Sequence, residues 1–308
     1  MRVLVTGAGG FVGPHLMRAL EAAGAEVLSL EHSHLRGRVD VACDITDAEA
    51  TAAALKQVQP DAVVHLAGLS SVAECARDAP RAFRVNALGA LHVCLGAQAV
   101  GKRCRVLLVS SGEVYGAAAA AGPVSEAGPV DPVNVYGASK RAAEVAALQL
   151  CHAGLDAVVV RAFNHIGPGQ TPTFVLPSFA QQLAKVPRGG KVVLEVGNLA
   201  AVRDFSHVAD VVAAYALLLE KGARGEVYNV GSGEGRSIEA MLGLLVARSG
   251  REVEVRVDPK RLRPVEIPTL VADVAKLRAL GWQPRRTAEE ALGEVLEEME
   301  RAGATPAR

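Results

Sequence analysis

Two side chains in the middle of the chain have the types and the spacing needed for proton transfer. Tyr136 and Lys140 lie four residues apart in V-Y-G-A-S-K, near the start of a predicted helix, so they share one helix face. A lysine ammonium stabilises a phenolate, and we therefore expect it to lower the pKa of Tyr136 toward neutrality. The phenol could then exchange a proton with a hydroxyl or carbonyl group. Ser111, which ends an apolar run in V-S-S-G-E-V-Y-G, could hydrogen-bond the same oxygen.

The N-terminal residues predict a site for a phosphate-containing ligand. The strand-like segment Arg2–Thr6 runs directly into T-G-A-G-G-F-V-G, whose glycines are spaced by three. Glycine permits the positive φ of a tight turn and lets a pyrophosphate approach the N-terminus of the following helix. The order of strand, glycine turn and helix therefore predicts dinucleotide binding. The residues of this turn are Gly7, Gly10, Phe11, Val12 and Gly13.

Glu31, at the end of the second strand-like segment, bears on which dinucleotide binds. A carboxylate there accepts hydrogen bonds from ribose hydroxyls and repels a 2′-phosphate, which favours NAD(H). Arg36 and Arg38 follow closely and could contact a phosphate instead, so NADP(H) stays open, and Glu31 could also be a solvated strand end. Further residues expected along the cofactor are Asp44, Ile45, Leu66, Ala67 and Gly68.

Short apolar runs alternate with longer amphipathic stretches over the first two thirds of the chain. The candidate strands are Arg2–Thr6, Glu26–Leu30, Ala62–Leu66, Val106–Ser110, Ala157–Arg161 and Glu226–Val230. The candidate helices lie near 12–23, 48–58, 80–100, 134–153 and 209–221. The strands are almost continuously apolar, as expected when helices cover both faces of a parallel sheet. We therefore predict an α/β fold with a doubly wound parallel sheet of the Rossmann type, which binds ligands beyond the carboxyl ends of its strands.

The regular pattern loosens after Arg161. Residues 189–203 look irregular, and the alanine run 117–121, flanked by glycines and a proline, predicts a surface loop. The helices expected in the last part of the chain lie near 174–185, 237–249, 273–280 and 287–302. We therefore predict a smaller C-terminal substrate lobe. The expected division is 1–165 plus 200–232 for the dinucleotide-binding domain, and 166–199 plus 233–308 for the lobe.

Composition excludes several classes of protein. The 308 residues carry 33 Lys and Arg against 33 Asp and Glu, so no basic excess points to nucleic acid. Half of the residues are hydrophobic and 21% are charged, which indicates a globular protein with a large core. The five cysteines are far apart, and we expect neither a metal site nor a disulfide framework. With no signal peptide or long apolar run, we expect a cytoplasmic protein without a membrane segment.

These motifs together resemble the extended short-chain dehydrogenase/reductase family of nucleotide-sugar enzymes. The resemblance rests on the glycine turn, Ser111, Tyr136-x-x-x-Lys140 and R-A-F-N-H-I-G-P-G, and it covers nearly the whole chain. It implies a Rossmann domain that binds NAD(P), a lobe that binds a nucleoside-diphosphate sugar, and catalytic roles for Ser111, Tyr136 and Lys140. It also places Asn86 beside the cofactor. Finally, it implies a homodimer through the helices near 80–100 and 134–153, which carry small and apolar residues.

Within this family, the second half of the chain resembles the branch that acts on GDP-mannose derivatives. It looks most similar to reductases of GDP-4-keto-6-deoxymannose, and 4,6-dehydratases are close behind. By position, Asn164, Arg203 and Arg263 would contact the diphosphate and Glu266 a ribose hydroxyl. The alternatives are a structural ion pair of Arg203 with Asp204 and a solvated loop position for Arg263. The remaining expected substrate contacts are Ser71, Val175 and Asn198.

Glu113 separates the alternatives. A 4,6-dehydratase needs a further base and acid, and many dehydratases carry Asp-Glu after the catalytic hydroxyl residue, whereas here Gly112-Glu113 follows Ser111. We therefore expect a reductase, with a dehydratase or a 4-epimerase as the alternative and Glu113 as the candidate base in a dehydratase. A binding protein with a dead site is a further hypothesis, but the retention of both Tyr136 and Lys140 argues against it.

Overall fold

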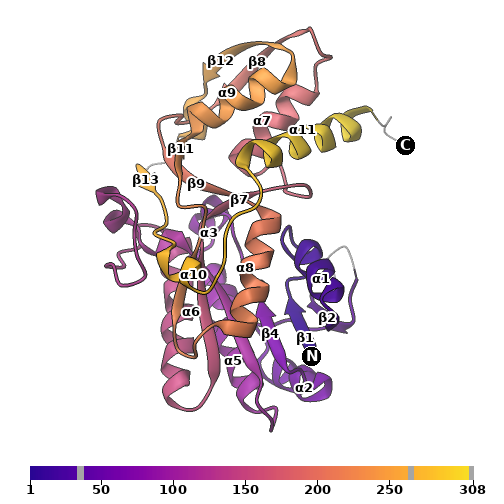
Figure 1. The fold of residues 1–308 in the computed structure, drawn as a ribbon, viewed down its shortest axis with the longest axis vertical. Helices are drawn as coiled ribbons and strands as arrows, with labels where there is room; N and C mark the ends of the chain where they lie inside the picture. The colour runs from indigo at the N-terminus through magenta and orange to yellow at the C-terminus, as the bar shows by residue number, and fades with distance from the viewer. Residues whose placement is uncertain (33–37, 263–266, 305–308) are drawn as a thin grey trace.

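The computed structural model describes residues 1–32, 38–262 and 267–304, which form a larger and a smaller lobe (Figure 1). The larger lobe contains a seven-stranded parallel sheet with the order β10-β6-β5-β4-β1-β2-β3. Its strands are β1 (Arg2–Thr6), β2 (Glu26–Glu31), β3 (Val41–Ala42), β4 (Ala62–His65), β5 (Arg105–Ser111), β6 (Asp156–Ala162) and β10 (Val227–Val230). This arrangement confirms the predicted doubly wound α/β fold.

Helices cover both faces of this sheet, which explains why its strands are apolar throughout. One face packs on α1 (Gly13–Ala22) and α8 (Val208–Lys221) through residues such as Val3 and Val5. The other packs on α2 (Ala48–Val58), α5 (Gly89–Gln98) and α6 (Val135–His152) through residues such as Leu4 and Val63. Successive side chains of a strand therefore enter different cores, because they point to opposite faces of the sheet.

The long helix expected near 80–100 is divided into three parts. It consists of α4 (Ala79–Phe83), a π-helical turn η1 (Arg84–Leu88) and α5, and it follows a short helix α3 (Val72–Arg77) that we did not predict. Single π-helical turns inside α-helices occur frequently at functional sites. Here the turn contains Asn86, whose contacts are described below.

The smaller lobe has its own apolar core. Its helices are α7 (Val175–Ala184), α9 (Ile238–Ser249) and α11 (Ala288–Ala304), and they share this core with one face of the parallel pair β8 (Lys191–Val196) and β12 (Glu252–Val257). The expectation of irregular structure over 189–203 is wrong, because this segment contains β8 and the start of β9 (Val202–His207). Exposed and buried residues alternate along β8, as in a strand with one covered face.

A small sheet lies where the two lobes meet. In it β9 pairs with β7 (Asn164–Ile166), β11 (Gly235–Ser237) and β13 (Thr269–Leu270). The chain then returns to the larger lobe, where Leu277 in α10 (Ala275–Ala279) and the nearby Trp282 join the core on the α1 and α8 face. The remaining short turns are the 3₁₀ segments η2 (Gly112–Val114), η3 (Ala117–Ala121) and η4 (Pro259–Arg261).

The alanine run is ordered differently from our expectation. Residues Ala117–Ala121 form the 3₁₀ turn η3, and the side chain of Ala119 is fully buried beside Val114 and Tyr115. Ala119 therefore belongs to a small core, while Ala117 at the start of the run is exposed. The prediction of a surface loop is wrong for Ala119 and agrees with the exposure of Ala117.

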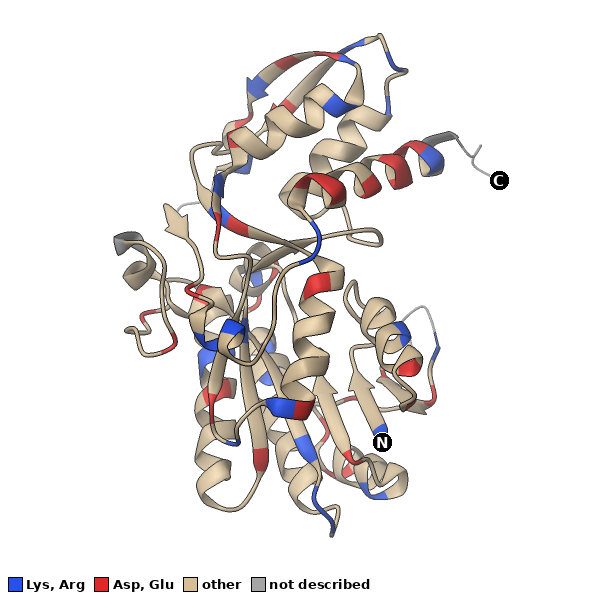
Figure 2. Cartoon of the chain, viewed as in Figure 1, with Lys and Arg blue, Asp and Glu red and all other residues tan. Residues whose placement is uncertain are grey.

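Charged side chains are spread over both lobes, with Asp and Glu gathered along α11 (Figure 2). Within the described part of the chain, no helix is long and apolar enough to cross a membrane.

Candidate active site

The glycine turn after β1 brings three backbone segments into close contact. Gly7 has a φ of +70°, and a Cβ on it would lie 2.6 Å from the backbone nitrogen of Ala67, next to the end of β4. A Cβ on Gly13 would clash with the carbonyl oxygen of Ala8. Helix α1 starts at Gly13 with no side-chain cap, so its first N–H groups are available to an anion. The turn therefore has the shape and the donors that a pyrophosphate needs.

Replacing Gly13 with alanine tests this close packing. The new methyl group would meet the backbone of Ala8, which cannot move as a side-chain end can. We expect the free energy of unfolding to fall by about 1–3 kcal/mol and dinucleotide affinity to fall at least about tenfold. Urea unfolding and a fluorescence titration with NADH and NADPH measure the two effects.

Gly243→Ala is the matched control for this substitution. Gly243 lies in α9, and a Cβ there meets nothing within 4 Å. Alanine should leave dinucleotide affinity unchanged and raise stability by about 0.5–1 kcal/mol, as expected inside a helix. Unaltered dinucleotide binding by the Gly13→Ala variant would contradict the proposed role of the turn.

Glu31 is directed at the glycine turn and buried. Its side chain is 2% exposed, and its carboxylate accepts a hydrogen bond from the Gly9 N–H. Burial raises the pKa of this carboxyl, while the bond from Gly9 acts in the opposite direction. Arg38, which could have offered a phosphate contact, instead binds Asp40 and Glu21. Arg36 lies outside the described residues.

The other residues expected along the cofactor lie mostly in one cavity of about 1110 Å³. This cavity runs from the glycine turn past the carboxyl ends of β4 and β5 to the small sheet between the lobes. The members of the cofactor set that line it are Gly7, Gly10, Phe11, Val12, Gly13, Glu31, Asp44, Ile45, Leu66, Ala67, Gly68, Tyr136 and Lys140. The Asp44 carboxylate accepts hydrogen bonds from Thr46, which fixes the loop after β3.

Asn86 lies behind the cavity wall and holds the loop after β4. Its amide both accepts from and donates to the backbone of Leu69, at 2.8 and 3.0 Å, and it donates to the hydroxyl of Ser139 on α6. A Cβ on Gly68 would lie 2.8 Å from Asn86 Oδ1 and 3.3 Å from Lys140 Nζ. Asn86 therefore fixes the position of Gly68 beside Lys140 through a buried hydrogen-bond network.

Ser111, Tyr136 and Lys140 line the same cavity, at the carboxyl end of β5 and the start of α6. The expected lowering of the Tyr136 pKa is wrong for this structure, because burial raises that pKa to about 12 and the Glu113 carboxylate adds to the effect. A hydrogen bond with Ser111 acts in the opposite direction. The ammonium of Lys140 donates to the carbonyl of Val109 at 2.9 Å, and burial lowers its pKa to about 8. At neutral pH both groups therefore carry their protons.

Residues expected to contact the substrate reach this cavity from both lobes and from the small sheet between them. Ser71, Asn164, Val175, Asn198 and Arg203 all line it, whereas Arg263 and Glu266 lie outside the described residues. The Asp204 carboxylate accepts hydrogen bonds from Ser232, Gly233 and Ala272. The alternative in which Asp204 pairs with Arg203 is therefore wrong for Asp204. Arg203 is buried in the wall of the cavity, and its guanidinium donates to the carbonyl of Val202 at 2.8 Å.

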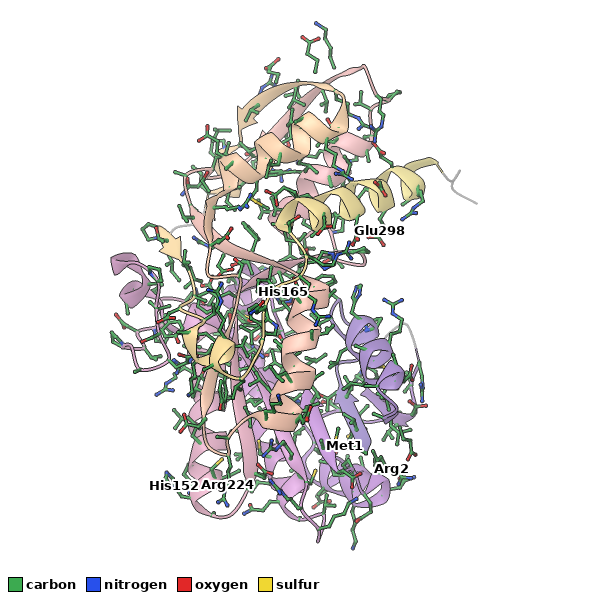
Figure 3. The ribbon with its side chains drawn as sticks, viewed as in Figure 1. Met1, Arg2, His152, His165, Arg224 and Glu298 are labelled. Atoms are coloured by element: carbon green, nitrogen blue, oxygen red, sulfur yellow. The ribbon has the colours of Figure 1, made fainter. Side chains whose placement is uncertain are left out.

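Some residues of the cavity were missed by sequence reasoning. The ring of His165 stacks on that of Phe11, with centroids 5.7 Å apart, and it lies where the two lobes meet (Figure 3). Arg81, Arg84 and Arg261 also line the cavity. The motif N-H-I-G-P-G was a signal for His165. No comparable signal existed for the arginines, because the sequence does not show which way a surface side chain points.

A parallel nucleotide-binding sheet with such a cavity at its carboxyl edge is the architecture of the extended short-chain dehydrogenases/reductases, a class of enzymes. Within this class, a family model described as GDP-mannose 4,6 dehydratase matches residues 4–295, and the chain belongs to that family. No group of His, Cys, Asp and Glu in the described part of the chain could hold a metal ion.

Individual relatives cover the whole length of the chain. It is 38% identical over 305 residues to GDP-6-deoxy-D-mannose reductase of Pseudomonas aeruginosa, with 97% of each protein covered. The structure of RMD from P. aeruginosa complexed with NADPH has a TM-score of 0.85 at 36% identity, covering 98% of both chains. UDP-glucose 4-epimerase of Thermus thermophilus in complex with NAD has a TM-score of 0.86 at 30% identity, covering 99% of this chain and 100% of that chain.

Proposed function

We propose that the protein reduces the 4-keto group of a nucleoside-diphosphate 6-deoxyhexose at the expense of NADH or NADPH. The best candidate reaction converts GDP-4-keto-6-deoxy-D-mannose to GDP-D-rhamnose. The observation that carries this proposal is the single cavity that brings together the glycine turn, Tyr136 with Ser111 and Lys140, and Arg203 of the small sheet. The similarity to a GDP-6-deoxy-D-mannose reductase along 97% of the chain supports the choice of reaction.

Tyr136 is placed to act as the proton donor of a reduction. A ketone reduction needs a proton donor next to the carbonyl oxygen, and a phenol with a pKa of about 12 keeps its proton at neutral pH. Tyr136 would donate this proton, Ser111 would hold the carbonyl oxygen, and Lys140 would stabilise the phenolate that forms.

The glycine turn fits a nicotinamide dinucleotide, which would supply the hydride. Gly7 and Gly13 leave no room for side chains, so backbone N–H groups at the start of α1 would bind the pyrophosphate. Gly68 lets the loop after β4 pack directly against Asn86 and Lys140, next to the proposed nicotinamide end of the cavity. The domain that binds the cofactor would be residues 1–165 plus 200–232.

The nucleotide sugar would bind between the cofactor and the predicted lobe of residues 166–199 plus 233–308, apart from α10 and Trp282, which pack in the core of the larger lobe. Arg203 and Arg261 bring guanidinium groups to this side of the cavity, which suit a diphosphate, and Arg261 would exchange its ion pairs with Glu195 and Asp258 for the phosphate. Asn164 and Asn198 add amide groups for phosphate or sugar oxygens. Arg263 and Glu266 stay part of the proposed substrate set by resemblance alone.

A GDP-mannose 4,6-dehydratase or a nucleotide-sugar 4-epimerase is the alternative. The family to which the chain belongs favours it, as does Glu113, which lines the cavity next to Tyr136. Such enzymes restore the cofactor in every cycle, so they consume none. Incubating the purified enzyme with several nucleotide sugars, with and without added NADH or NADPH, separates the reactions. Consumption of reduced cofactor with a 4-keto sugar is expected, and conversion of GDP-mannose without it would favour the dehydratase.

Glu31 gives a prediction about cofactor choice. Its buried carboxylate at the glycine turn would repel a 2′-phosphate, so NADH should serve at least as well as NADPH. Glu31→Ser should raise the ratio of kcat/KM for NADPH to kcat/KM for NADH by at least about tenfold. Glu26→Ser, at the exposed start of the same strand, is the control and should leave the ratio unchanged. An unaltered ratio in the Glu31 variant would exclude a role for this carboxylate in the choice.

We further propose a homodimer formed through α5 and α6. These helices pack against each other and bury Ala90 and Leu150 inside the subunit, but Leu95 and Val145 are 44% and 52% exposed. Exposed apolar residues on neighbouring helices fit an interface with a second copy. Light scattering at micromolar concentration should give the mass of a dimer, and Val145→Glu should give a folded monomer. A monomeric parent protein would contradict the proposal.

A further inference from the structure

The carboxylate of Glu113 is hydrogen-bonded to Asn134, the residue that caps the N-terminus of α6. Asn134 is the N-cap of α6, and its Oδ1 accepts a hydrogen bond from the Gly137 N–H at 2.8 Å. Its Nδ2 donates to Glu113 Oε2, also at 2.8 Å. Two hydrogen bonds therefore connect Glu113 to the first turn of the helix that carries Tyr136 and Lys140.

The polarity of this contact fixes the orientation of the Asn134 amide. A backbone N–H can only donate and a carboxylate can only accept, so Oδ1 must face Gly137 and Nδ2 must face Glu113. An aspartate at position 134 could still cap the helix, but it would turn a negative oxygen toward Glu113. The pair consequently does more than cap the helix, since it also holds the loop after β5 against the helix start.

Backbone contacts at the same place make Tyr136 sensitive to the position of this loop. A Cβ on Gly137 would lie 2.6 Å from the carbonyl oxygen of Glu113, so loop and helix touch directly. The Glu113 N–H donates to Ser111 Oγ at 3.2 Å, and Ser111 in turn hydrogen-bonds Tyr136. A shift of the loop would therefore change the distance between the two groups that meet the substrate oxygen.

We propose that Glu113 is a positioning residue, which acts through Asn134 to hold Tyr136 in register with Ser111, and that it is not the base of a dehydration. This inference rests on the reductase function proposed above. Its negative charge also favours the protonated phenol, which is the form that a reduction uses. The residue that a dehydratase would use for proton abstraction is thus part of the support of the catalytic helix.

An exchange of donor and acceptor tests the proposal. In the double variant Glu113→Gln with Asn134→Asp, the glutamine amide can donate to the aspartate, and the aspartate still caps Gly137. We expect Glu113→Ala and Asn134→Asp each to lower kcat by about 10- to 100-fold, with KM for the sugar within about threefold of the parent, because the reacting groups are misplaced. The double variant should recover kcat to within about fivefold of the parent.

Each other outcome overturns the proposal. A double variant as inactive as Glu113→Ala shows that the carboxylate itself is needed, and full activity of Asn134→Asp shows that capping alone matters. Thermal unfolding is measured for every variant, and midpoints close to that of the parent show that the losses of activity do not come from unfolding.

The parent enzyme is assayed first with both the keto sugar and GDP-mannose. A failure of the proposed reductase function is seen in this first assay, and the variants are then compared in whichever reaction the parent catalyses.

Discussion

Replacement of Tyr136 with phenylalanine should lower kcat for reduction of the keto sugar by about 100- to 10,000-fold, the usual contribution of a positioned proton donor. The phenol lies in the cavity beside Ser111 and keeps its proton at neutral pH, whereas a phenylalanine ring has no proton to give to the new alkoxide. The dissociation constant for NADH or NADPH should change by less than about threefold, because the glycine turn anchors the dinucleotide. Steady-state kinetics and a fluorescence titration measure both values.

Tyr215→Phe is the matched control. Tyr215 lies fully buried in α8, and its hydroxyl has no hydrogen-bond partner among the described residues. Removal of that hydroxyl should leave kcat unchanged. A Tyr136→Phe enzyme that keeps the turnover of the parent would show that the proton comes from elsewhere.

Replacement of Glu144 with leucine should lower the free energy of unfolding strongly, and this is the second large effect that we expect. Glu144 lies on α6 and is 0% exposed, and its two carboxylate oxygens accept hydrogen bonds from Arg161 on β6 at 3.1 and 3.0 Å. Ser110 and Arg141 bind the same carboxylate. The substitution would leave the Arg161 charge buried without its partner, which costs about 3–5 kcal/mol. Urea unfolding of the variant and the parent measures the loss.

Removal of both charges provides the control for this prediction. In Glu144→Leu with Arg161→Met, no unpaired charge remains in the core, so most of the lost stability should return. A single Glu144→Leu variant within about 1 kcal/mol of the parent would mean that Arg161 finds another partner or reaches water.

The larger lobe could be predicted from the sequence because its signals are local. Each strand of the parallel sheet is a short apolar run next to an amphipathic helix, and the predicted strand Arg2–Thr6 matches the structure at both ends. The exception is β3, which has only two residues and presents no pattern. The glycine turn, Ser111 and the Tyr136 to Lys140 spacing are contiguous motifs of the same kind, and the structure brings them into one cavity.

The smaller lobe and the small sheet were harder to predict from the sequence, because their strands pair across long stretches of chain. Strand β9 pairs with β7, β11 and β13, which lie before and after it in the sequence, and all three of these have three residues or fewer. The hydrogen bond of Glu113 with Asn134 and the stacking of His165 on Phe11 depend on side-chain direction in the folded chain. No spacing rule in the sequence encodes such directions.

Transfer of deuterium tests the central claim most directly. The enzyme is given GDP-4-keto-6-deoxymannose with NADH that carries deuterium at the hydride-donating position, and the product is analysed by mass spectrometry together with the oxidised cofactor. A net reductase should place one deuterium on C4 of the product for each NADH oxidised. A product without deuterium, or enzyme that turns GDP-mannose into the 4-keto sugar while no added NADH is consumed, would contradict the reductase function and support the dehydratase.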